Sequence, residues 1–100
     1  MKPRFLLPAR REFIEAVQYY NAQRVRLGDE FRDEAWETNR RINEFPVAWY
    51  LLGGAIRRCQ MHRFPYGLIY EETDVEIVII AVAHLHREPG YWRRRLKSDI

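Results

Sequence analysis

The sequence has 100 residues, of which 47% are hydrophobic and 31% are charged, and its formal net charge is +3. This length predicts one domain over residues 1–100, and this composition excludes a chain that is disordered throughout, because disorder requires few apolar residues and a high net charge. Cys59 is the only cysteine, which excludes an intrachain disulfide. No stretch is apolar over the ~18 residues that cross a membrane, and no secretion signal is recognisable. We therefore expect a soluble cytoplasmic protein that does not associate with membranes.

A helix is predicted over residues 9–26. It follows a short, partly apolar segment at residues 2–7, which we expect to form a strand, and Pro8 suits the start of a helix because that position needs no N–H donor. Gly28 is placed to end the helix in the left-handed conformation. Apolar residues at spacings of three and four predict one buried face, formed by Ala9, Phe13, Ala16, Val17 and Tyr20.

A second helix is predicted to follow, with Asp29 as its N-cap and acidic residues in its first turn, where they suit the helix dipole. The short connection between the two helices predicts an antiparallel hairpin. We expect residues 44–54 to form a loop, because they contain Pro46 and two adjacent glycines. The buried stripe of the second helix is predicted to consist of Phe31, Ala35, Thr38 and Ile42.

Three strands are predicted at residues 55–62, 66–72 and 75–83. Their connections are short, which favours a three-stranded antiparallel meander, because parallel strands need a long crossover. Residues 77–82 are apolar without alternation, which indicates a strand inside the sheet with both faces covered. A short helix is predicted at residues 89–96. The predicted fold class is α+β, in the order β-α-α-β-β-β, with the helix hairpin on one face of the sheet.

Several local motifs occur together along this predicted fold. They are Arg63-Phe64-Pro65-Tyr66, Ile69-Tyr70, the apolar run at residues 77–82, His84, Arg87-Glu88-Pro89, Tyr91-Trp92 and Arg95, together with Tyr19-Tyr20, Leu27-Gly28 and Phe31 in the first half. Over nearly its whole length, the chain resembles the RelE/ParE superfamily of toxins from type II toxin–antitoxin modules. The resemblance implies the same α+β fold and a small bacterial toxin that is neutralised by an antitoxin encoded beside it.

The superfamily divides by target. The resemblance implies either a RelE-like protein, which cleaves mRNA on the ribosome, or a ParE-like protein, which binds DNA gyrase and has no known RNase role. By this resemblance, Gly67 occupies the position at which RelE-like RNases carry an arginine. Because RNA cleavage needs a cation at the phosphate, Gly67 favours the ParE-like alternative. Another arginine, such as Arg57 or Arg63, could replace the missing cation.

If the protein is an RNase, it also needs a general base for the attacking 2′-hydroxyl and a general acid for the leaving oxygen. His84 and His86 are two residues apart, so they share a face if the strand continues. His84 is then either a general acid or a structural residue bonded to the backbone. The candidate catalytic residues are His84, His86, Arg87, Tyr91 and Arg63.

The C-terminal tail is basic and aromatic, and it is the predicted target-binding surface. Its arginines could bind gyrase or RNA phosphates while its aromatic residues anchor it to the sheet. The target-binding candidates are Arg87, Tyr91, Trp92, Arg93, Arg94 and Arg95.

The resemblance also implies an antitoxin whose disordered tail folds on the toxin, laying a helix in a groove or a strand on an open edge. We expect the C-terminal segment and the antitoxin to share the sheet face that the helices leave uncovered. The antitoxin-binding candidates are Phe5, Leu7, Phe13 and Tyr20. No metal or cofactor is expected, because the histidines and Cys59 do not form a recognised ligand set.

The sequence thus predicts a ParE-like toxin that binds DNA gyrase without catalysis of its own and forms a hetero-oligomer with a cognate antitoxin. One alternative is a RelE-like endoribonuclease that acts on the ribosome and its mRNA. The other is a non-toxic homologue that only binds antitoxin.

Overall fold

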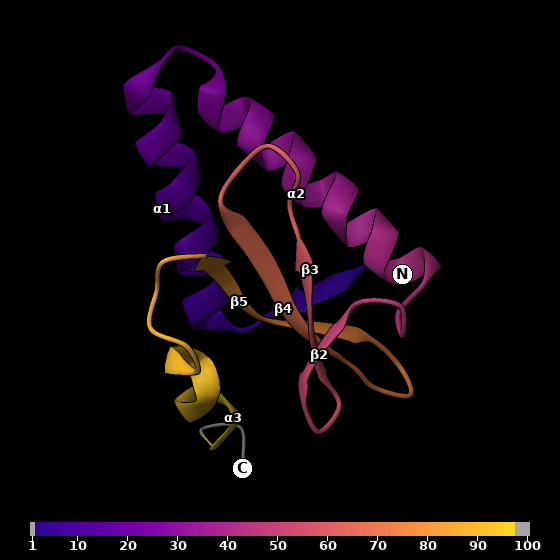
Figure 1. Cartoon of the computed structure of the whole chain (residues 1–100). Helices are drawn as coiled ribbons and strands as arrows, with labels where there is room; N and C mark the ends of the chain where they lie inside the picture. The colour runs from indigo at the N-terminus through magenta and orange to yellow at the C-terminus, as the bar shows by residue number, and fades with distance from the viewer. Residues whose placement is uncertain (1, 98–100) are drawn as a thin grey trace.

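The computed structural model describes residues 2–97, which form a five-stranded mixed sheet with a helix hairpin on one face (Figure 1). The elements are β1 (Pro3–Phe5), α1 (Leu7–Gln23), α2 (Leu27–Glu44), β2 (Tyr50–Gly53), β3 (Ile56–Gln60), β4 (Tyr66–Glu72), β5 (Ile77–His84), the 3-10 helix η1 (Tyr91–Arg93) and α3 (Arg94–Lys97). The strand order is β1-β5-β4-β3-β2, in which β1 is parallel to β5 and the other neighbours are antiparallel. The predicted α+β class is confirmed, with one strand more than predicted. Within the described residues, no helix has both the length and the apolarity needed to cross a membrane.

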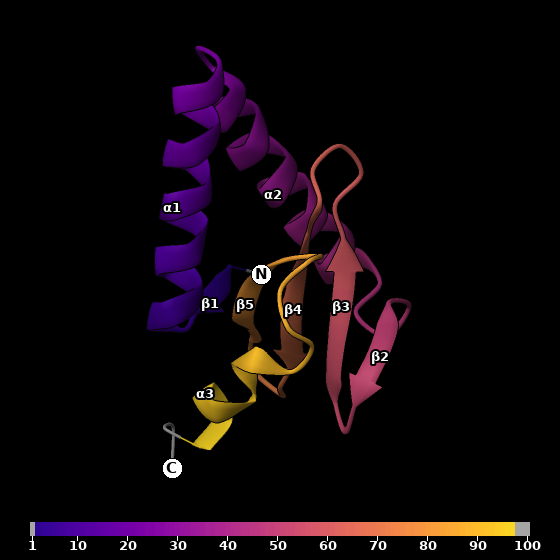
Figure 2. The same ribbon diagram turned by 60° about the vertical axis from the view of Figure 1, so that its left-hand side comes forward.

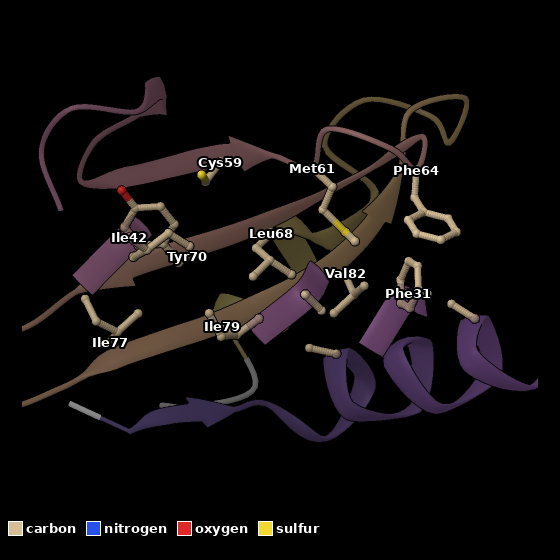
Figure 3. Close-up of a cluster of buried hydrophobic side chains, with 13 residues drawn as sticks. Phe31, Ile42, Cys59, Met61, Phe64, Leu68, Tyr70, Ile77, Ile79 and Val82 are labelled. Carbon is tan, nitrogen blue, oxygen red and sulfur yellow. The ribbon is translucent and has the colours of Figure 1, made fainter. Parts of the chain in front are cut away.

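The helix hairpin and the sheet enclose the main hydrophobic core (Figure 3). Phe31, Thr38 and Ile42 of α2 are fully buried, as their helical spacing predicted. Residues 77–83 of β5 are buried without interruption, which confirms a strand inside the sheet with both faces covered. The side chains labelled in Figure 3 are Phe31, Ile42, Cys59, Met61, Phe64, Leu68, Tyr70, Ile77, Ile79 and Val82.

The C-terminal segment covers the other face of the sheet (Figure 2). Trp92 of η1 is only 3% exposed and packs in a second cluster with Ile69 of β4 and Ile80 of β5. This packing confirms that the C-terminal segment contributes to covering the second face. These residues are buried by the chain itself, without an antitoxin.

The segment predicted as a loop at residues 44–54 contains a strand. β2 pairs with the start of β3, and Tyr50 lies opposite Arg58. Gly53 and Gly54 have φ angles of 151° and 56°, and they lead into the turn between the two strands. The glycine pair therefore marks a hairpin, because a tight turn between antiparallel strands needs residues with positive φ.

The helix boundaries also differ from the prediction. α1 begins at Leu7, so Leu7 is helical and does not belong to the N-terminal strand. The left-handed residue between the helices is Arg26, with a φ of 73°, and it is also the N-cap of α2. The roles predicted for Gly28 and Asp29 are therefore wrong. Both residues lie in the first turn of α2, where the charge of Asp29 still suits the helix dipole.

Gly28 is required because α1 and α2 approach each other closely at this point. A Cβ atom on Gly28 would lie 2.1 Å from the carbonyl oxygen of Val17 and 2.6 Å from Cγ of Asn21. Gly28→Ala is therefore expected to lower the free energy of unfolding by about 1–3 kcal/mol, as measured by urea denaturation.

Gly67→Ala is the matched control for this substitution. Gly67 is also buried, but the nearest atom to its added Cβ is Cγ of the flexible Arg58 side chain, at 3.0 Å. We expect a smaller loss of stability, because that side chain can move. Equal losses for the two variants would contradict the role of close helix packing at Gly28.

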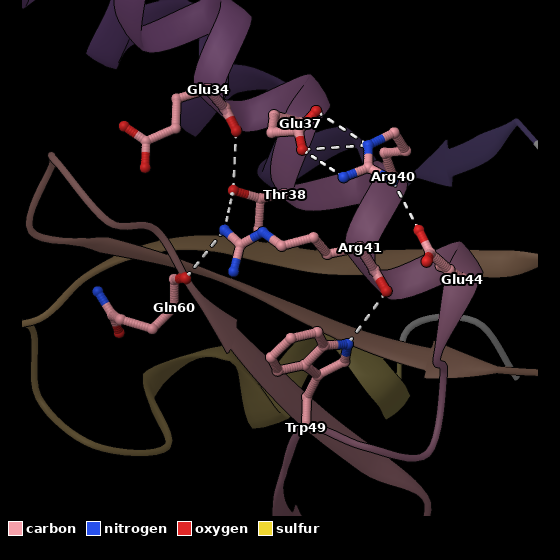
Figure 4. A network of polar contacts seen from close by, with 8 residues as sticks. All are labelled: Glu34, Glu37, Thr38, Arg40, Arg41, Glu44, Trp49 and Gln60. Carbon is pink, nitrogen blue, oxygen red and sulfur yellow. Dashed lines mark hydrogen bonds and ion pairs between the residues drawn. The ribbon is translucent and has the colours of Figure 1, made fainter.

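Polar contacts tie the end of α2 to the sheet (Figure 4). Nη2 of Arg41 donates to Oγ1 of Thr38 at 3.0 Å and to the carbonyl oxygen of Gln60 in β3 at 3.3 Å. Nε1 of Trp49 donates to the carbonyl oxygen of Arg41 at 3.3 Å. The last turn of α2 is thus held against β3 by hydrogen bonds as well as by apolar packing.

Candidate functional site

Glu12 of α1 holds the C-terminal segment against the sheet. Its carboxylate accepts a hydrogen bond from the hydroxyl of Tyr91 at 2.7 Å and from both Nη atoms of Arg95 at 2.8 Å. The side chains of Glu12 and Arg95 are only 13% and 15% exposed. We call Glu12, Tyr91 and Arg95 the C-terminal clasp.

The clasp also completes the edge of β5. β1 pairs with residues 77–79 of β5, and the chain then turns into α1. Further along β5, Arg95 donates to the carbonyl oxygen of Ile80 at 3.0 Å, and Glu12 accepts a hydrogen bond from the N–H of Val82 at 3.0 Å. Side chains therefore satisfy backbone groups that a longer β1 would have paired, as buried backbone groups require.

The predicted target-binding residues divide into a buried and an exposed group. The first group fixes the C-terminal segment: Tyr91 and Arg95 belong to the clasp, and Trp92 is buried. The second group presents positive charge to solvent and consists of Arg87, Arg93 and Arg94. The prediction that the aromatic residues anchor the tail while its arginines face outward therefore holds for Arg87, Arg93 and Arg94 but is wrong for Arg95, whose side chain is only 15% exposed.

The structure brings four of the five catalytic candidates together, namely His84, His86, Arg87 and Tyr91, and separates one. The rings of His84 and His86 lie 5.2 Å apart, and Nδ1 of His84 accepts a hydrogen bond from the backbone N–H of His86 at 3.0 Å. β5 ends at His84, so the two rings meet through a turn and not by strand alternation. Arg87 lines two pockets together with His84. Arg63 instead pairs with Glu30 of α2 at 2.6 Å.

Phe5 and Phe13, two of the antitoxin-binding candidates, line a groove between β1 and the helices. Their ring centroids lie 5.9 Å apart, and the volume of the groove is about 590 Å³. Leu7 is 59% exposed but does not line the groove. Tyr20 lies about two turns further along α1, where it packs against Phe31. The other residues that line the groove are Pro3, Arg4, Arg10, Ile14 and Trp36.

Ile14 and Trp36 are groove residues that were not predicted. Each follows directly after a residue of the apolar stripe of its helix, Phe13 in α1 and Ala35 in α2. Both are 45% exposed. A large apolar side chain just outside a buried stripe is the sequence signal that could have identified them.

Burial raises the pKa of several tyrosines. It raises the pKa of Tyr70 to about 12, and the hydroxyl of Tyr70 donates to the carbonyl oxygen of Pro46 at 2.5 Å. Burial is also the main cause of the raised pKa of Tyr91, and the hydrogen bond to Glu12 raises this pKa further. The pKa values of Tyr20 and Tyr66 are raised by burial as well.

The protein is expected to lose stability as the pH rises above ~10, because these phenols ionise near pH ~10 in the unfolded chain but at higher pH in the folded protein. The folded state then binds more protons than the unfolded state. The stability that these groups contribute is complete below pH ~10 and is lost as the pH rises toward the folded pKa of Tyr70, about 12. Urea midpoints measured on both sides of pH ~10 test this. An unchanged midpoint would contradict it.

A comparison with solved structures finds a similar fold. One of the matching chains comes from the structure "Chromosomal ParDE TA system from P. aeruginosa", with a TM-score of 0.71 and 11% sequence identity, over 84% of this chain and 95% of that chain. This protein has the fold of a ParDE-system chain. The fold that the resemblance to the RelE/ParE superfamily implied is thereby confirmed. No protein-family model matches the sequence, and neither does any curated protein.

Proposed function

We propose that this protein is the toxin of a type II toxin–antitoxin module and that it inhibits growth by binding DNA gyrase until a cognate antitoxin neutralises it. The observation that carries the proposal is the fold that it shares, over 84% of its length, with a chain of a ParDE system. The exposed arginines of the C-terminal segment, Arg87, Arg93 and Arg94, are the proposed gyrase contacts. The clasp and Trp92 hold them in position.

The antitoxin is proposed to bind the groove beside β1. The groove is lined by Phe5, Phe13, Ile14 and Trp36 and carries two arginines, which suits an amphipathic segment with acidic residues. β1 is an edge strand of the described sheet, so an extended segment could also pair with its outer side.

Ile14→Asp tests this binding surface by placing a charge in the apolar groove. It is expected to weaken antitoxin binding by about tenfold or more. Val25→Asp is the matched control, because Val25 is 80% exposed in the connection between the helices. A similar loss in both variants would argue against the groove.

Two observations support binding rather than catalysis. Residue 67 is a glycine and supplies no cation of its own. The hydroxyl of Tyr91 donates to Glu12, and burial raises its pKa, both of which oppose a role as a proton acceptor.

A RelE-like endoribonuclease is the second candidate, and the position of Arg58 favours it. Cγ of Arg58 lies 3.0 Å from the place that a Cβ of residue 67 would take. The side chain of Arg58, from the neighbouring strand β3, therefore passes over Gly67. Arg58 and His84 also line one hollow between the C-terminal segment and the sheet. In that case His84 would act as the general acid.

The deciding experiment tests the purified protein for inhibition of DNA supercoiling by gyrase and, separately, for mRNA cleavage during translation. Inhibition of supercoiling without cleavage is the expected result, and Arg87→Ala is expected to weaken it more than Arg11→Ala, which removes the same charge from the exposed side of α1. Cleavage without inhibition would identify an endoribonuclease. Neither activity, with antitoxin binding retained, would identify a non-toxic homologue.

A further inference from the structure

The longest uncharged stretch of the chain lies at one edge of the sheet. Residues 45–56 contain no charged side chain, although 31% of the sequence is charged. They lead from the end of α2 through β2 into β3. Four large apolar side chains of this stretch are at least half exposed, namely Phe45 (57%), Val47 (70%), Tyr50 (65%) and Leu51 (50%). The chain itself buries the apolar run of β5, but it leaves this second apolar stretch in contact with solvent.

β2 also leaves the outer side of its backbone without a partner strand. It is the last strand in the order β1-β5-β4-β3-β2, and among the described residues only β3 pairs with it (Figure 2). Natural proteins usually protect an edge strand with charged side chains or proline, which hinder pairing with another chain. β1, at the opposite edge, contains Pro3 and Arg4. β2 has neither kind of protection, because its sequence is Tyr50-Leu51-Leu52-Gly53.

We propose that β2 pairs with β2 of a second copy of this chain, in an antiparallel and two-fold symmetric dimer that joins the two sheets into one. Two-fold symmetry brings the same surface of both copies together. Residues that lie opposite one another in a continuous sheet point to the same face. Leu51 can therefore lie opposite Leu51 of the second copy, with Tyr50 opposite Leu52. A register centred on Leu52 would place Leu51 opposite Gly53, where it has no side chain to pack against.

The charges around β2 favour a second copy over a charged partner. The edge itself has no charged side chain that would select an acidic or a basic segment. Arg57 and Arg58 belong to β3, one strand further in. In the dimer the two β3 strands are three strand spacings apart, or ~14 Å, which exceeds the Debye length of ~8 Å at physiological salt. The guanidinium of Arg58 lies 5.1 Å from the ring centroid of Tyr50, but Tyr50 faces Leu52 of the second copy, so the two Arg58 side chains are not opposed.

The exposed apolar area is sufficient for a weak dimer. An aromatic side chain has ~150–250 Å² to bury, so each of the four exposed side chains leaves on the order of 100 Å² outside. With the backbone edges, two copies can cover roughly 1,000 Å², which is at the lower limit for a specific interface. We therefore expect a dissociation constant on the order of 10–100 μM. The groove beside β1 lies at the other edge of the sheet, so the dimer depends neither on antitoxin binding nor on gyrase binding.

The test measures sedimentation velocity of the full chain at concentrations from ~1 μM to ~1 mM, a range that spans the expected dissociation constant. The wild-type chain should change from monomer to dimer over this range. Leu51→Lys and Leu51→Glu should each weaken the dimer by about tenfold or more, because like charges directly opposite one another destabilise a strand pair. An equimolar mixture of these two variants should dimerise again, because lysine then lies opposite glutamate.

Val75→Lys is the control, because Val75 is 79% exposed in the connection between β4 and β5, outside the proposed interface. It should leave the dimer unchanged. Leu51→Cys gives a second measurement that does not depend on charge. Opposite residues of an antiparallel pair have Cα atoms ~4.5–5.5 Å apart, within the range of a disulfide. Under oxidising conditions Leu51→Cys should form a covalent dimer much faster than Val75→Cys, since Cys59 is buried in both.

Three results would overturn the proposal. The first is a wild-type chain that remains monomeric at ~1 mM, a concentration at which a dimer with the expected affinity would be mostly formed. The second is a dimer that Leu51→Lys weakens no more than Val75→Lys does, which would place the contact elsewhere on the surface. The third is an equimolar mixture of Leu51→Lys and Leu51→Glu that stays monomeric, together with equal cross-linking rates for Leu51→Cys and Val75→Cys, which would exclude Leu51 from the two-fold axis.

Discussion

Glu12→Ala is expected to lower the free energy of unfolding by about 3–5 kcal/mol, the range seen when one partner of a buried ion pair is removed. The substitution removes the carboxylate that forms the ion pair with Arg95, whose charged side chain is only 15% exposed. It also removes the acceptor for the hydroxyl of Tyr91 and for the N–H of Val82. Urea denaturation followed by tryptophan fluorescence measures the loss.

Glu15→Ala is the matched control, because Glu15 is an exposed glutamate one turn further along α1. Its effect is expected to stay within about 0.5 kcal/mol. In a double-mutant cycle, adding Arg95→Met to Glu12→Ala should recover part of the loss, because no unpaired buried charge remains. A loss below about 1 kcal/mol for Glu12→Ala would show that the clasp does not hold the C-terminal segment.

Trp92→Ala is the second substitution with a large expected effect. Trp92 is 3% exposed, and its removal opens a cavity in the cluster that includes Ile69 and Ile80. We expect a loss of about 3–5 kcal/mol in the free energy of unfolding. At a temperature where the variant is still folded, target binding should fall, because the exposed arginines no longer have a fixed support. Antitoxin binding should remain, because the groove beside β1 does not include Trp92.

Trp36→Ala is the control for this prediction and should show the opposite pattern. Trp36 is 45% exposed and lines the groove beside β1. Its replacement should cost less stability than that of Trp92 and should weaken antitoxin binding more than target binding. If both variants lose both interactions in parallel, the two proposed surfaces are not separate.

The parts of the fold that were predicted correctly have strong local patterns. The stripe of α2 repeats with the period of a helix, and its members Phe31, Ala35, Thr38 and Ile42 are all buried. The uninterrupted apolar run at residues 77–82 correctly indicated a strand with both faces covered. β2 was not predicted, because it is only four residues long and ends in Gly53. The two adjacent glycines were therefore interpreted as part of a loop.

The candidate site was less predictable, because its contacts join distant parts of the sequence. Glu12 and Arg95 are separated by 83 residues, and in the sequence Glu12 is an ordinary charge on a helix. Alternation along β3 places Arg57 and Arg58 on opposite faces of the sheet. It could not show that Arg58, and neither Arg57 nor Arg63, lies over Gly67, because that depends on the pairing of β3 with β4.

The pairing of β1 with β5, and of Glu12 with Arg95, has a consequence for the synthesis of the protein on the ribosome. β1 emerges well before its partner strand, which is 74 residues later, since Pro3 pairs with Ile77. The partner of Glu12 follows 83 residues after it, which takes on the order of 4–17 s at ribosomal rates of ~5–20 residues per second. During this interval the helix hairpin has no completed sheet to pack on. The native contacts of this domain are therefore complete only after Arg95 has been synthesised, and that interval is available for the proposed antitoxin to bind.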